Sequence, residues 1–167
     1  YVRDDDIPAF VHDGVADIGI VGRNEADEQG LDLVVLRDLG FSQCRLSVAV
    51  PHALPYTSLQ SLEGLRIATS YPKILTRILG ENGVTATLVE VSGSVELTPA
   101  VGIADAICDL VSTGATLAMN GLHEVETIYT STAVMIARRE LGDREKGRIL
   151  ERLLLRIDAV MKAASYK

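Results

Sequence analysis

The 167-residue sequence is poor in aromatic residues, in cysteine and in long apolar runs. It has no tryptophan and two phenylalanines, and none of its apolar runs approaches the ~20 residues that a membrane-spanning helix needs. We therefore expect no contact with a membrane. The two cysteines, Cys44 and Cys108, lie far apart in apolar surroundings. We interpret them as buried, reduced thiols of a cytoplasmic protein.

An excess of basic residues and a metal-binding pattern are also missing. Lys and Arg number 16 against 23 Asp and Glu, so the net charge is −7, which argues against a nucleic-acid partner. His12, His52 and His123 are scattered without the spacing of a zinc site. An anionic ligand would therefore have to be held locally, by backbone N–H groups, a few basic side chains or a metal ion.

What the sequence does contain is an alternation of short Val- and Ile-rich runs with amphipathic segments. The short runs predict strands at 18–22, 32–36, 45–50, 65–70, 86–91, 107–111 and 126–137. Helical periodicity predicts helices at 7–15, 72–83, 99–107, 116–125 and 142–165. In the last helix one apolar face is expected from Ile149, Leu153, Ile157, Val160 and Met161. This alternation indicates the α/β class with largely parallel sheets.

Two segments of the chain resemble each other, 14-GVADIGIVG-22 and 102-GIADAICDLVSTG-114. Each has a glycine, a branched apolar residue and Ala-Asp, followed by an apolar strand and a glycine loop. Ligands of open α/β sheets bind beyond the carboxyl ends of strands, so both loops are candidates for one cleft. The similarity favours two lobes that face each other.

Crossings between these lobes are expected in the extended runs around 45–51 and 128–136. The first lobe would then be discontinuous and comprise residues 1–45 and 130–167. The second lobe would be an insertion formed by residues 46–129.

The most informative segment is 112-STGATL-117, which follows the apolar run 107-ICDLV-111. Its small residues leave backbone N–H groups uncovered, and a helix that starts here would add its positive end. The hydroxyls of Ser112, Thr113 and Thr116 can donate further hydrogen bonds to phosphate oxygens. No lysine follows the glycine, so this is not the Gly-x-x-x-x-Gly-Lys nucleotide loop. The same residues suit a helix N-cap, and the loop alone does not decide between the two.

Asp109 lies just ahead of this loop, where a carboxylate is badly placed for a phosphate but well placed for sugar hydroxyls. An acid followed by Thr-Gly-x-Thr suits a ribose 5-phosphate, because the acid accepts from the hydroxyls and the loop donates to the phosphate. Glu96, ahead of Pro99, adds a second carboxylate nearby in sequence, unless it is a solvated loop acid.

The run 96-ELTPAVGIADAICDLVSTGATL-117 resembles the signature of the ATP phosphoribosyltransferase family, the first enzyme of histidine biosynthesis. The residues that fill its fixed positions are Glu96, Gly102, Ala104, Ile107, Asp109, Leu110, Thr113, Gly114, Thr116 and Leu117. Further segments of the chain resemble sequence blocks of the same family, and they lie at 3–11, 17–28, 38–51, 66–75 and 120–136. The resemblance implies two α/β lobes similar to type II periplasmic binding proteins, with the active site in the cleft between them.

The resemblance implies transfer of the 5-phosphoribosyl group of phosphoribosyl pyrophosphate to N1 of ATP, with release of pyrophosphate. The implied catalytic residues are Asp109 and Glu96. The implied phosphoribosyl pyrophosphate site comprises Asp109, Ser112, Thr113, Gly114, Ala115, Thr116 and Leu117. The implied ATP site comprises Arg3, Asp5, Gly22, Tyr71 and Lys73. Mg²⁺ is the expected cofactor and would arrive on the pyrophosphate, without an assigned protein ligand.

Basic side chains in loops or at strand ends could face this cleft, because two polyanionic substrates must enter an acidic protein. They are Arg3, Arg23, Arg45 and Lys73. Of these, Arg3 and Lys73 are preferred.

The resemblance also concerns what lies beyond the two ends of the chain. Family members begin well before Tyr1, so we expect an N-terminal part of the first lobe to be missing. The tail 142–167 resembles long-form members, which continue into a small regulatory domain that binds histidine. That domain is expected to be absent, so histidine would be a feedback inhibitor only where it is present. A homo-oligomer is implied, a dimer or, in the long form, a hexamer.

Two other functions remain open. A two-lobe solute-binding protein of the periplasmic type would share the architecture but gives no reason for an acid ahead of a phosphate loop. A phosphoribosyltransferase of the single-sheet type has an acidic pair before a similar loop, whereas here Cys108 stands where the second acid would be.

Overall fold

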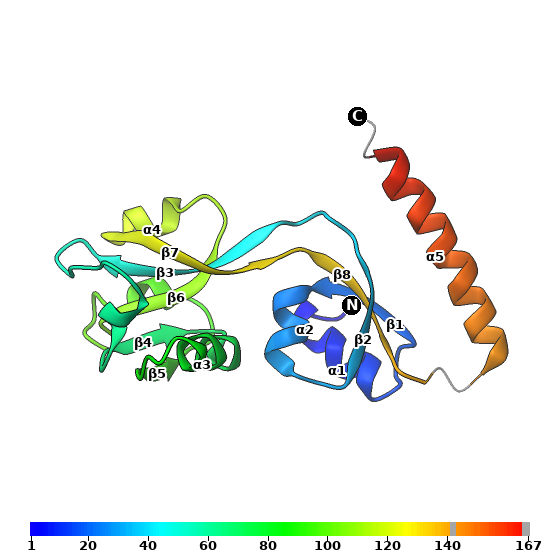
Figure 1. Ribbon diagram of the computed structural model, residues 1–167, viewed down its shortest axis with the longest axis horizontal. Coiled ribbons are helices and arrows are strands. Elements are labelled where there is room, and N and C mark those ends of the chain that lie inside the picture. The colour runs from blue at the N-terminus through cyan, green and yellow to red at the C-terminus, as the bar shows by residue number, and fades with distance from the viewer. Residues whose placement is uncertain (141–142, 165–167) are drawn as a thin grey trace.

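The computed structural model describes residues 1–140 and 143–164, which form two lobes, each built on its own β-sheet (Figure 1). The elements in chain order are η1 (Asp4–Asp6), α1 (Ile7–His12), β1 (Ile18–Gly22), α2 (Arg23–Gln29), β2 (Leu33–Asp38), β3 (Cys44–Pro51), η2 (Leu59–Leu62), β4 (Arg66–Thr69), α3 (Pro72–Glu81), β5 (Thr87–Glu90), η3 (Val95–Leu97), β6 (Ala106–Val111), α4 (Ala115–Met119), β7 (Leu122–Ser131), β8 (Ala133–Arg138) and α5 (Arg144–Ala164). The predicted α/β class and the arrangement in two lobes are confirmed.

The first lobe is a three-stranded sheet in the order β1-β8-β2, with β8 antiparallel to both neighbours. Helix α1 packs on one face, where Val11 meets Val134 and Ile136 in an apolar cluster. Gly19 permits this close approach, because a Cβ at this position would lie 2.5 Å from Cγ2 of Ile7. The helix therefore sits directly on the backbone of β1.

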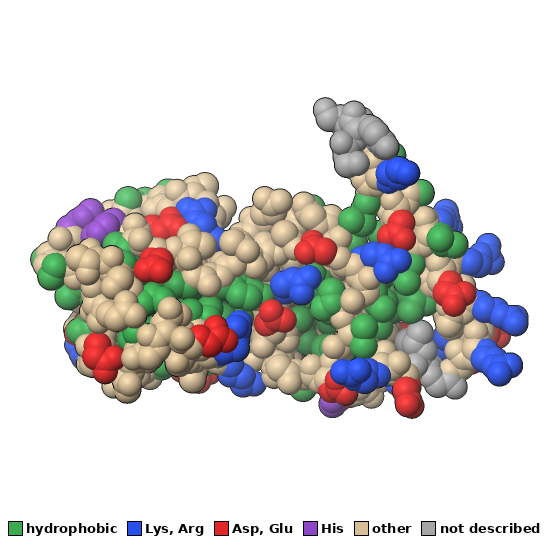
Figure 2. All heavy atoms as spheres, viewed as in Figure 1, with side chains coloured by type: hydrophobic (Ala, Val, Ile, Leu, Met, Phe, Trp, Pro, Cys, Tyr) green, Lys and Arg blue, Asp and Glu red, His purple; other side chains and the backbone are tan. Residues whose placement is uncertain are grey.

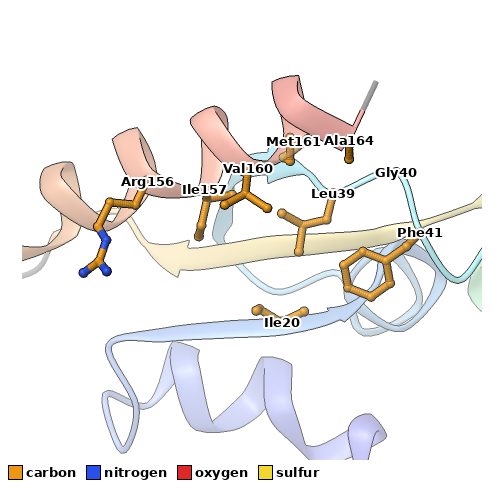
Figure 3. Close-up of a pocket in the computed structure, with 9 residues that line it drawn as sticks. All are labelled: Ile20, Leu39, Gly40, Phe41, Arg156, Ile157, Val160, Met161 and Ala164. Carbon is orange, nitrogen blue, oxygen red and sulfur yellow. The ribbon is translucent and has the colours of Figure 1, made fainter. Parts of the chain in front are cut away.

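Helix α5 lies along the other face of this sheet (Figure 3). Its predicted apolar residues Ile157, Val160 and Met161 line a hollow of about 720 Å³ together with Ile20 of β1 (Figure 3). The apolar face is only partly covered, because Val160 is 68% exposed and no described residue of the helix is buried. Hydrophobic side chains gather on this inner side, and basic side chains lie along the outer side of the helix (Figure 2). The predicted helix is confirmed over its described part, and its expected end positions, 142 and 165, lie outside the described residues.

The second lobe is a five-stranded sheet in the order β5-β4-β6-β3-β7. Strand β4 is parallel to β5 and β6, but β3 is antiparallel to both β6 and β7. The prediction of largely parallel sheets is therefore wrong for both lobes. The cause is the connectivity, because β3 and β8, which follow the crossings between the lobes, enter their sheets at inner positions and run against their neighbours.

Two segments join the lobes, residues 39–43 between β2 and β3 and Thr132 between β7 and β8 (Figure 1). The single strand predicted at 126–137 is wrong, since the run is divided into β7 and β8, which belong to different sheets. The exact residue boundaries assigned to the lobes from the sequence stay a prediction.

Several expected helices differ from the structure. Residues 99–102 form turns, because Gly102 has a φ of 75° and the strand β6 already begins at Ala106. The helix expected at 116–125 is limited to α4, after which β7 begins at Leu122. Helix α1 is likewise shorter than predicted, ending at His12.

Helix α2 was not predicted, because its sequence, 23-RNEADEQ-29, is almost wholly polar and lacks apolar periodicity. Gly30 ends the helix in the left-handed conformation, with a φ of 65° and its N–H donated to the Ala26 carbonyl. Cys44 and Cys108 are both free, and Cys108 is buried as expected, whereas Cys44 is only partly buried, so the expectation is wrong for Cys44. Among the described residues no helix is long and apolar enough to cross a membrane.

Candidate active site

The candidate site lies at the carboxyl end of β6, an inner strand of the second sheet. A hollow of about 280 Å³ opens here, and it is lined by Glu96, Ile107, Asp109, Leu110, Val111, Ser112, Thr113, Gly114, Thr116 and Leu117. The fold thus brings Glu96 together with the loop, although Glu96 precedes Ser112 in the sequence by a whole turn region and a strand. Of the residues predicted to bind phosphoribosyl pyrophosphate, Ala115 alone does not line the hollow.

The loop leaves most of its hydrogen-bond donors uncommitted. Gly114 is the N-cap of α4 with a φ of 77°, a conformation that suits glycine, and it has no side chain to cap the helix. The Thr113 hydroxyl accepts only a long bond of 3.4 Å from the Ala115 N–H. In the described part of the chain the hydroxyls of Ser112 and Thr116 have no partner. The side chains of the loop therefore cap helix α4 only weakly, and their hydroxyls remain available to a ligand.

Asp109 lies one strand position from the buried core, half-buried at the mouth of the hollow. Burial raises the pKa of its carboxyl group, and the charge of Glu96 raises it further. The Leu110 N–H opposes both effects by donating a 2.8 Å hydrogen bond to Oδ1. Two neighbouring acids thus stand beside a loop of donors, an arrangement that can accept sugar hydroxyls and counter a positive charge.

An ion pair connects this loop to the strands below it. Arg45 on β3 donates through Nε and Nη2 to the two carboxylate oxygens of Glu124 on β7, both at 2.6 Å. Its remaining nitrogen, Nη1, donates to the Ser112 carbonyl at 3.0 Å. The guanidinium of Arg45 holds the pKa of Glu124 at about 2. Arg45, considered from the sequence as a cation facing the cleft, is therefore engaged within the protein.

A second cluster lies where α2 of the first lobe meets the start of α3 in the second. The Tyr71 hydroxyl donates to Glu25 at 2.7 Å and accepts from the Asn24 amide at 3.2 Å. The Asn24 oxygen accepts from the Ser131 hydroxyl at 2.6 Å. Gly22 makes room for this amide, because a Cβ at Gly22 would lie 2.4 Å from Oδ1 of Asn24.

The two clusters are electrostatically connected. Burial raises the pKa of Tyr71, the bond to Glu25 raises it further, and the charge of Asp109 adds to this effect. The Tyr71 hydroxyl and the Asp109 carboxylate are therefore close enough for the charge of one to affect the ionisation of the other.

A family model described as ATP phosphoribosyltransferase matches residues 3–159 of the chain. The chain belongs to the ATP phosphoribosyltransferase family. A curated ATP phosphoribosyltransferase from Cytophaga hutchinsonii is 53% identical over 167 residues, which are 100% of this chain and 58% of that relative. The chain thus spans somewhat over half the length of the curated relatives it matches.

One solved structure agrees with this membership, and a second shares the fold. The ATP phosphoribosyl transferase (HisG:HisZ) complex from Thermotoga maritima is similar at a TM-score of 0.82 and 27% identity, over 97% of this chain and 78% of that one. The substrate-binding protein of an amino acid ABC transporter is similar at a TM-score of 0.67 and 14% identity, over 99% of this chain and 73% of that one. The second likeness concerns the fold alone.

The other residues that the family resemblance assigned to ATP have different surroundings. Arg3 forms an exposed ion pair of 3.0 Å with Asp5. Asp5 lies close enough to Glu25 that its charge helps burial to raise the pKa of Glu25. Lys73 donates to the Gln29 carbonyl at 3.0 Å. Of the five residues, the structure joins Gly22 and Tyr71 through Asn24, while Arg3, Asp5 and Lys73 have other partners.

Two carboxylates of the candidate site are oxygen donors of the kind that Mg²⁺ prefers. No group of three or more His, Cys, Asp or Glu that could hold a metal occurs in residues 1–140 and 143–164. His52 and His123 stack on each other, with ring centroids 4.7 Å apart. Glu96 and Asp109 lie beside the loop 112–117, and Mg²⁺ commonly uses one or two carboxylates together with substrate phosphates and water.

Proposed function

We propose that the full-length protein transfers the 5-phosphoribosyl group of phosphoribosyl pyrophosphate to N1 of ATP and releases pyrophosphate, as the first step of histidine biosynthesis. The observation that carries the proposal is the hollow at the end of β6, where Glu96 and Asp109 stand beside the open loop 112–117. Membership of the ATP phosphoribosyltransferase family supports it.

In this proposal the loop binds the 5-phosphate. Backbone N–H groups of the loop and the hydroxyls of Ser112, Thr113 and Thr116 donate to the phosphate oxygens. Asp109 accepts hydrogen bonds from the ribose hydroxyls at the mouth of the hollow. The uncommitted donors of the loop support this role, because a structural cap would use them internally.

The chemistry breaks the bond between the anomeric carbon and the pyrophosphate oxygen and forms a bond from that carbon to N1 of adenine, with inversion. Positive charge develops on the ribosyl group as the first bond lengthens. Alignment and charge stabilisation therefore matter more than a protein nucleophile. N1 of adenine is unprotonated at neutral pH, so no general base is required, and the carboxylates of Asp109 and Glu96 stabilise the developing charge.

The adenine side of the site is assigned to the boundary between the lobes around Tyr71 and Gly22. The Tyr71 ring is held there by Glu25 and Asn24, and Asp109 is near enough to influence its hydroxyl. A nucleotide bound at this boundary places its base beside the ribose held by Asp109. Arg3, Asp5 and Lys73 stay proposed ATP contacts, which require exchange of their present partners.

Mg²⁺ bound to phosphoribosyl pyrophosphate would neutralise part of the charge of the leaving group, which matters for a protein of net charge −7. Glu96 and Asp109 are the residues that would hold it. We also propose a homo-oligomer in the cytoplasm, where ATP is available, and histidine as feedback inhibitor where a regulatory domain is present.

The test is an assay of the full-length protein with ATP, phosphoribosyl pyrophosphate and Mg²⁺, followed through the absorbance of N1-phosphoribosyl-ATP. We expect product and stoichiometric pyrophosphate. A folded protein that forms no product would overturn the assignment and favour a solute-binding function, which the two-lobe fold also allows.

A variant of the loop tests the site separately from the reaction. Thr113→Val is isosteric but lacks the hydroxyl, so it should weaken binding of phosphoribosyl pyrophosphate by about tenfold, the value of one hydrogen bond to a charged group. Affinity for ATP should be unchanged. Thr87→Val, on the exposed start of β5, is the matched control. Equal loss of both affinities would mean that the loop is structural.

A further inference from the structure

The Ser112 carbonyl, at the start of the loop, is held by Arg45 on β3. We infer that Arg45, clamped by Glu124, is a positioning residue that fixes the loop 112–117 for the phosphate of phosphoribosyl pyrophosphate. The inference rests on the proposed function for the identity of the ligand, but the anchoring itself can be measured without it.

The geometry of the guanidinium carries the argument. Two parallel bonds of 2.6 Å from Nε and Nη2 to the carboxylate of Glu124 fix both the position and the plane of the group. Because the guanidinium is rigid, the direction of the third nitrogen, Nη1, is then fixed as well. That nitrogen donates to the Ser112 carbonyl at 3.0 Å, so the position of the carbonyl is defined by β3 and β7 together.

The effect reaches the donors of the loop through the peptide plane. In a trans peptide the carbonyl of Ser112 and the N–H of Thr113 point in opposite directions. Holding the carbonyl toward Arg45 therefore turns the Thr113 N–H away from Arg45. Within the described residues this N–H has no acceptor, and Thr113 lines the hollow. Arg45 thus sets the orientation of a donor that the proposal gives to the phosphate.

Glu124 is itself held in place, which makes it a firm clamp. The hydroxyl of Ser47, two residues along β3 from Arg45, donates to Oε1 of Glu124 at 2.8 Å. The hydroxyl of Thr127 on β7 donates to the same oxygen at 3.2 Å. The Glu124 side chain is 25% exposed, so water screens the pair less than a fully exposed one.

The same sheet contains a natural control at the opposite end of β6. Arg66 donates through Nη2 and Nε to the two oxygens of Asp105, at 2.7 and 3.1 Å. Its Nη1 donates to the Gly102 carbonyl at 2.8 Å. The chemistry repeats that of Arg45, Glu124 and Ser112, but the turn held by Arg66 precedes the strand and does not line the hollow. A substitution of Arg66 therefore removes the same kind of clamp without changing a residue that lines the hollow.

The experiment compares Arg45→Gln and Arg66→Gln in the full-length protein, with KM for each substrate and kcat as readouts. We expect Arg45→Gln to raise KM for phosphoribosyl pyrophosphate about tenfold, the factor for one lost charge-assisted hydrogen bond, with KM for ATP and kcat much less affected. Arg66→Gln should leave both KM values unchanged. Equal effects of the two variants on phosphoribosyl pyrophosphate, or equal effects of Arg45→Gln on both substrates, would overturn the positioning role.

Two further measurements complete the test. Arg45→Lys keeps the charge but cannot form the bidentate pair, so it should retain most of the KM increase, and full recovery would contradict the geometric argument. Hydrogen exchange of the Ala118 amide, which donates to the Gly114 carbonyl of the loop at 3.1 Å, should accelerate in Arg45→Gln and not in Arg66→Gln. If the wild-type protein turns over neither substrate, the proposed function fails, whereas unchanged exchange of this amide would refute the anchoring itself.

Discussion

The Glu28 carboxylate, on α2 of the first lobe, accepts a 2.8 Å hydrogen bond from the backbone N–H of Lys73 at the start of α3 in the second lobe. Its other oxygen accepts from the Ile74 N–H at 2.9 Å. These N–H groups belong to the first turn of the helix and have no partner within it. A side chain of one lobe thus caps a helix of the other, and the cap exists only while the lobes are in contact.

Glu28→Ala should therefore lower the free energy of unfolding by about 1 kcal/mol, as for other lost helix caps. Glu28→Gln should have a smaller effect, because its amide oxygen still accepts one bond but lacks the charge that favours a helix amino end. Urea unfolding measures the free energy of unfolding of both variants, and Glu90→Ala on the exposed end of β5 is the control. Hydrogen exchange at the start of α3 should increase in step, and unchanged exchange would show that the cap adds nothing.

Asp109→Asn should abolish most activity yet stabilise the protein at neutral pH. The pKa of Asp109 is raised above its usual 3.8, first by burial, so the folded state binds the proton more tightly than the unfolded state. Stability is then lost as pH rises from about 3.8 through the raised pKa, because the buried carboxylate must ionise. Asn avoids this cost and can still accept from the Leu110 N–H.

The measurement is thermal unfolding of wild type and Asp109→Asn at several pH values. The variant should melt higher at pH 7, and the two curves should meet below pH 3, where the wild-type carboxyl is protonated in both states. A variant that is less stable than wild type at pH 7 would mean that the charged carboxylate is satisfied in the fold. The loss of activity, about 10²-fold or more, follows from removal of charge beside the reacting carbon.

Much of the fold could be predicted from the sequence because most strands carry a strong local pattern. The runs at 18–22, 45–50 and 107–111 are dense in branched residues between turn residues, and each is a strand in the structure. Whether neighbouring strands pair parallel or antiparallel is not a local property, since it depends on the order in which the chain enters the two sheets. The parallel prediction failed for that reason.

The candidate site divides in the same way. Asp109 and the loop 112–117 lie within nine residues of sequence, so their chemistry could be predicted from one short stretch. Glu124, which clamps Arg45, is distant in sequence and reaches it only through the pairing of β3 with β7. Helix α2 was missed because it makes its contacts with polar side chains, and the signal in its sequence was the acidic run ending at Gly30.

Glu124→Gln should reduce stability at neutral pH, and the reduction should disappear in acid. Arg45 holds the pKa of Glu124 at about 2, below its usual 4.5, so the pair contributes stability above pH 4.5 that is lost as pH falls toward 2. The contribution is roughly 1–3 kcal/mol after allowance for solvent screening. Denaturant unfolding at pH 7, 4 and 2.5 measures the difference between wild type and variant. A difference that is constant over this range would show that charge is not its source.

Gly22→Ala should disturb the Tyr71 cluster without touching the loop. Its Cβ would lie 2.4 Å from Oδ1 of Asn24, the oxygen that accepts from Ser131, so the amide must move or the backbone must shift. Such overpacking costs about 1–3 kcal/mol.

The matched control is Gly80→Ala in α3, where a Cβ meets no atom within 4 Å and the φ is ordinary. That variant should gain about 0.5–1 kcal/mol, since alanine favours a helix interior more than glycine. In steady-state kinetics Gly22→Ala should raise KM for ATP more than KM for phosphoribosyl pyrophosphate, because Asn24 donates to the Tyr71 hydroxyl on the nucleotide side. A larger increase in KM for phosphoribosyl pyrophosphate than in KM for ATP would mean that the nucleotide does not bind beside Tyr71.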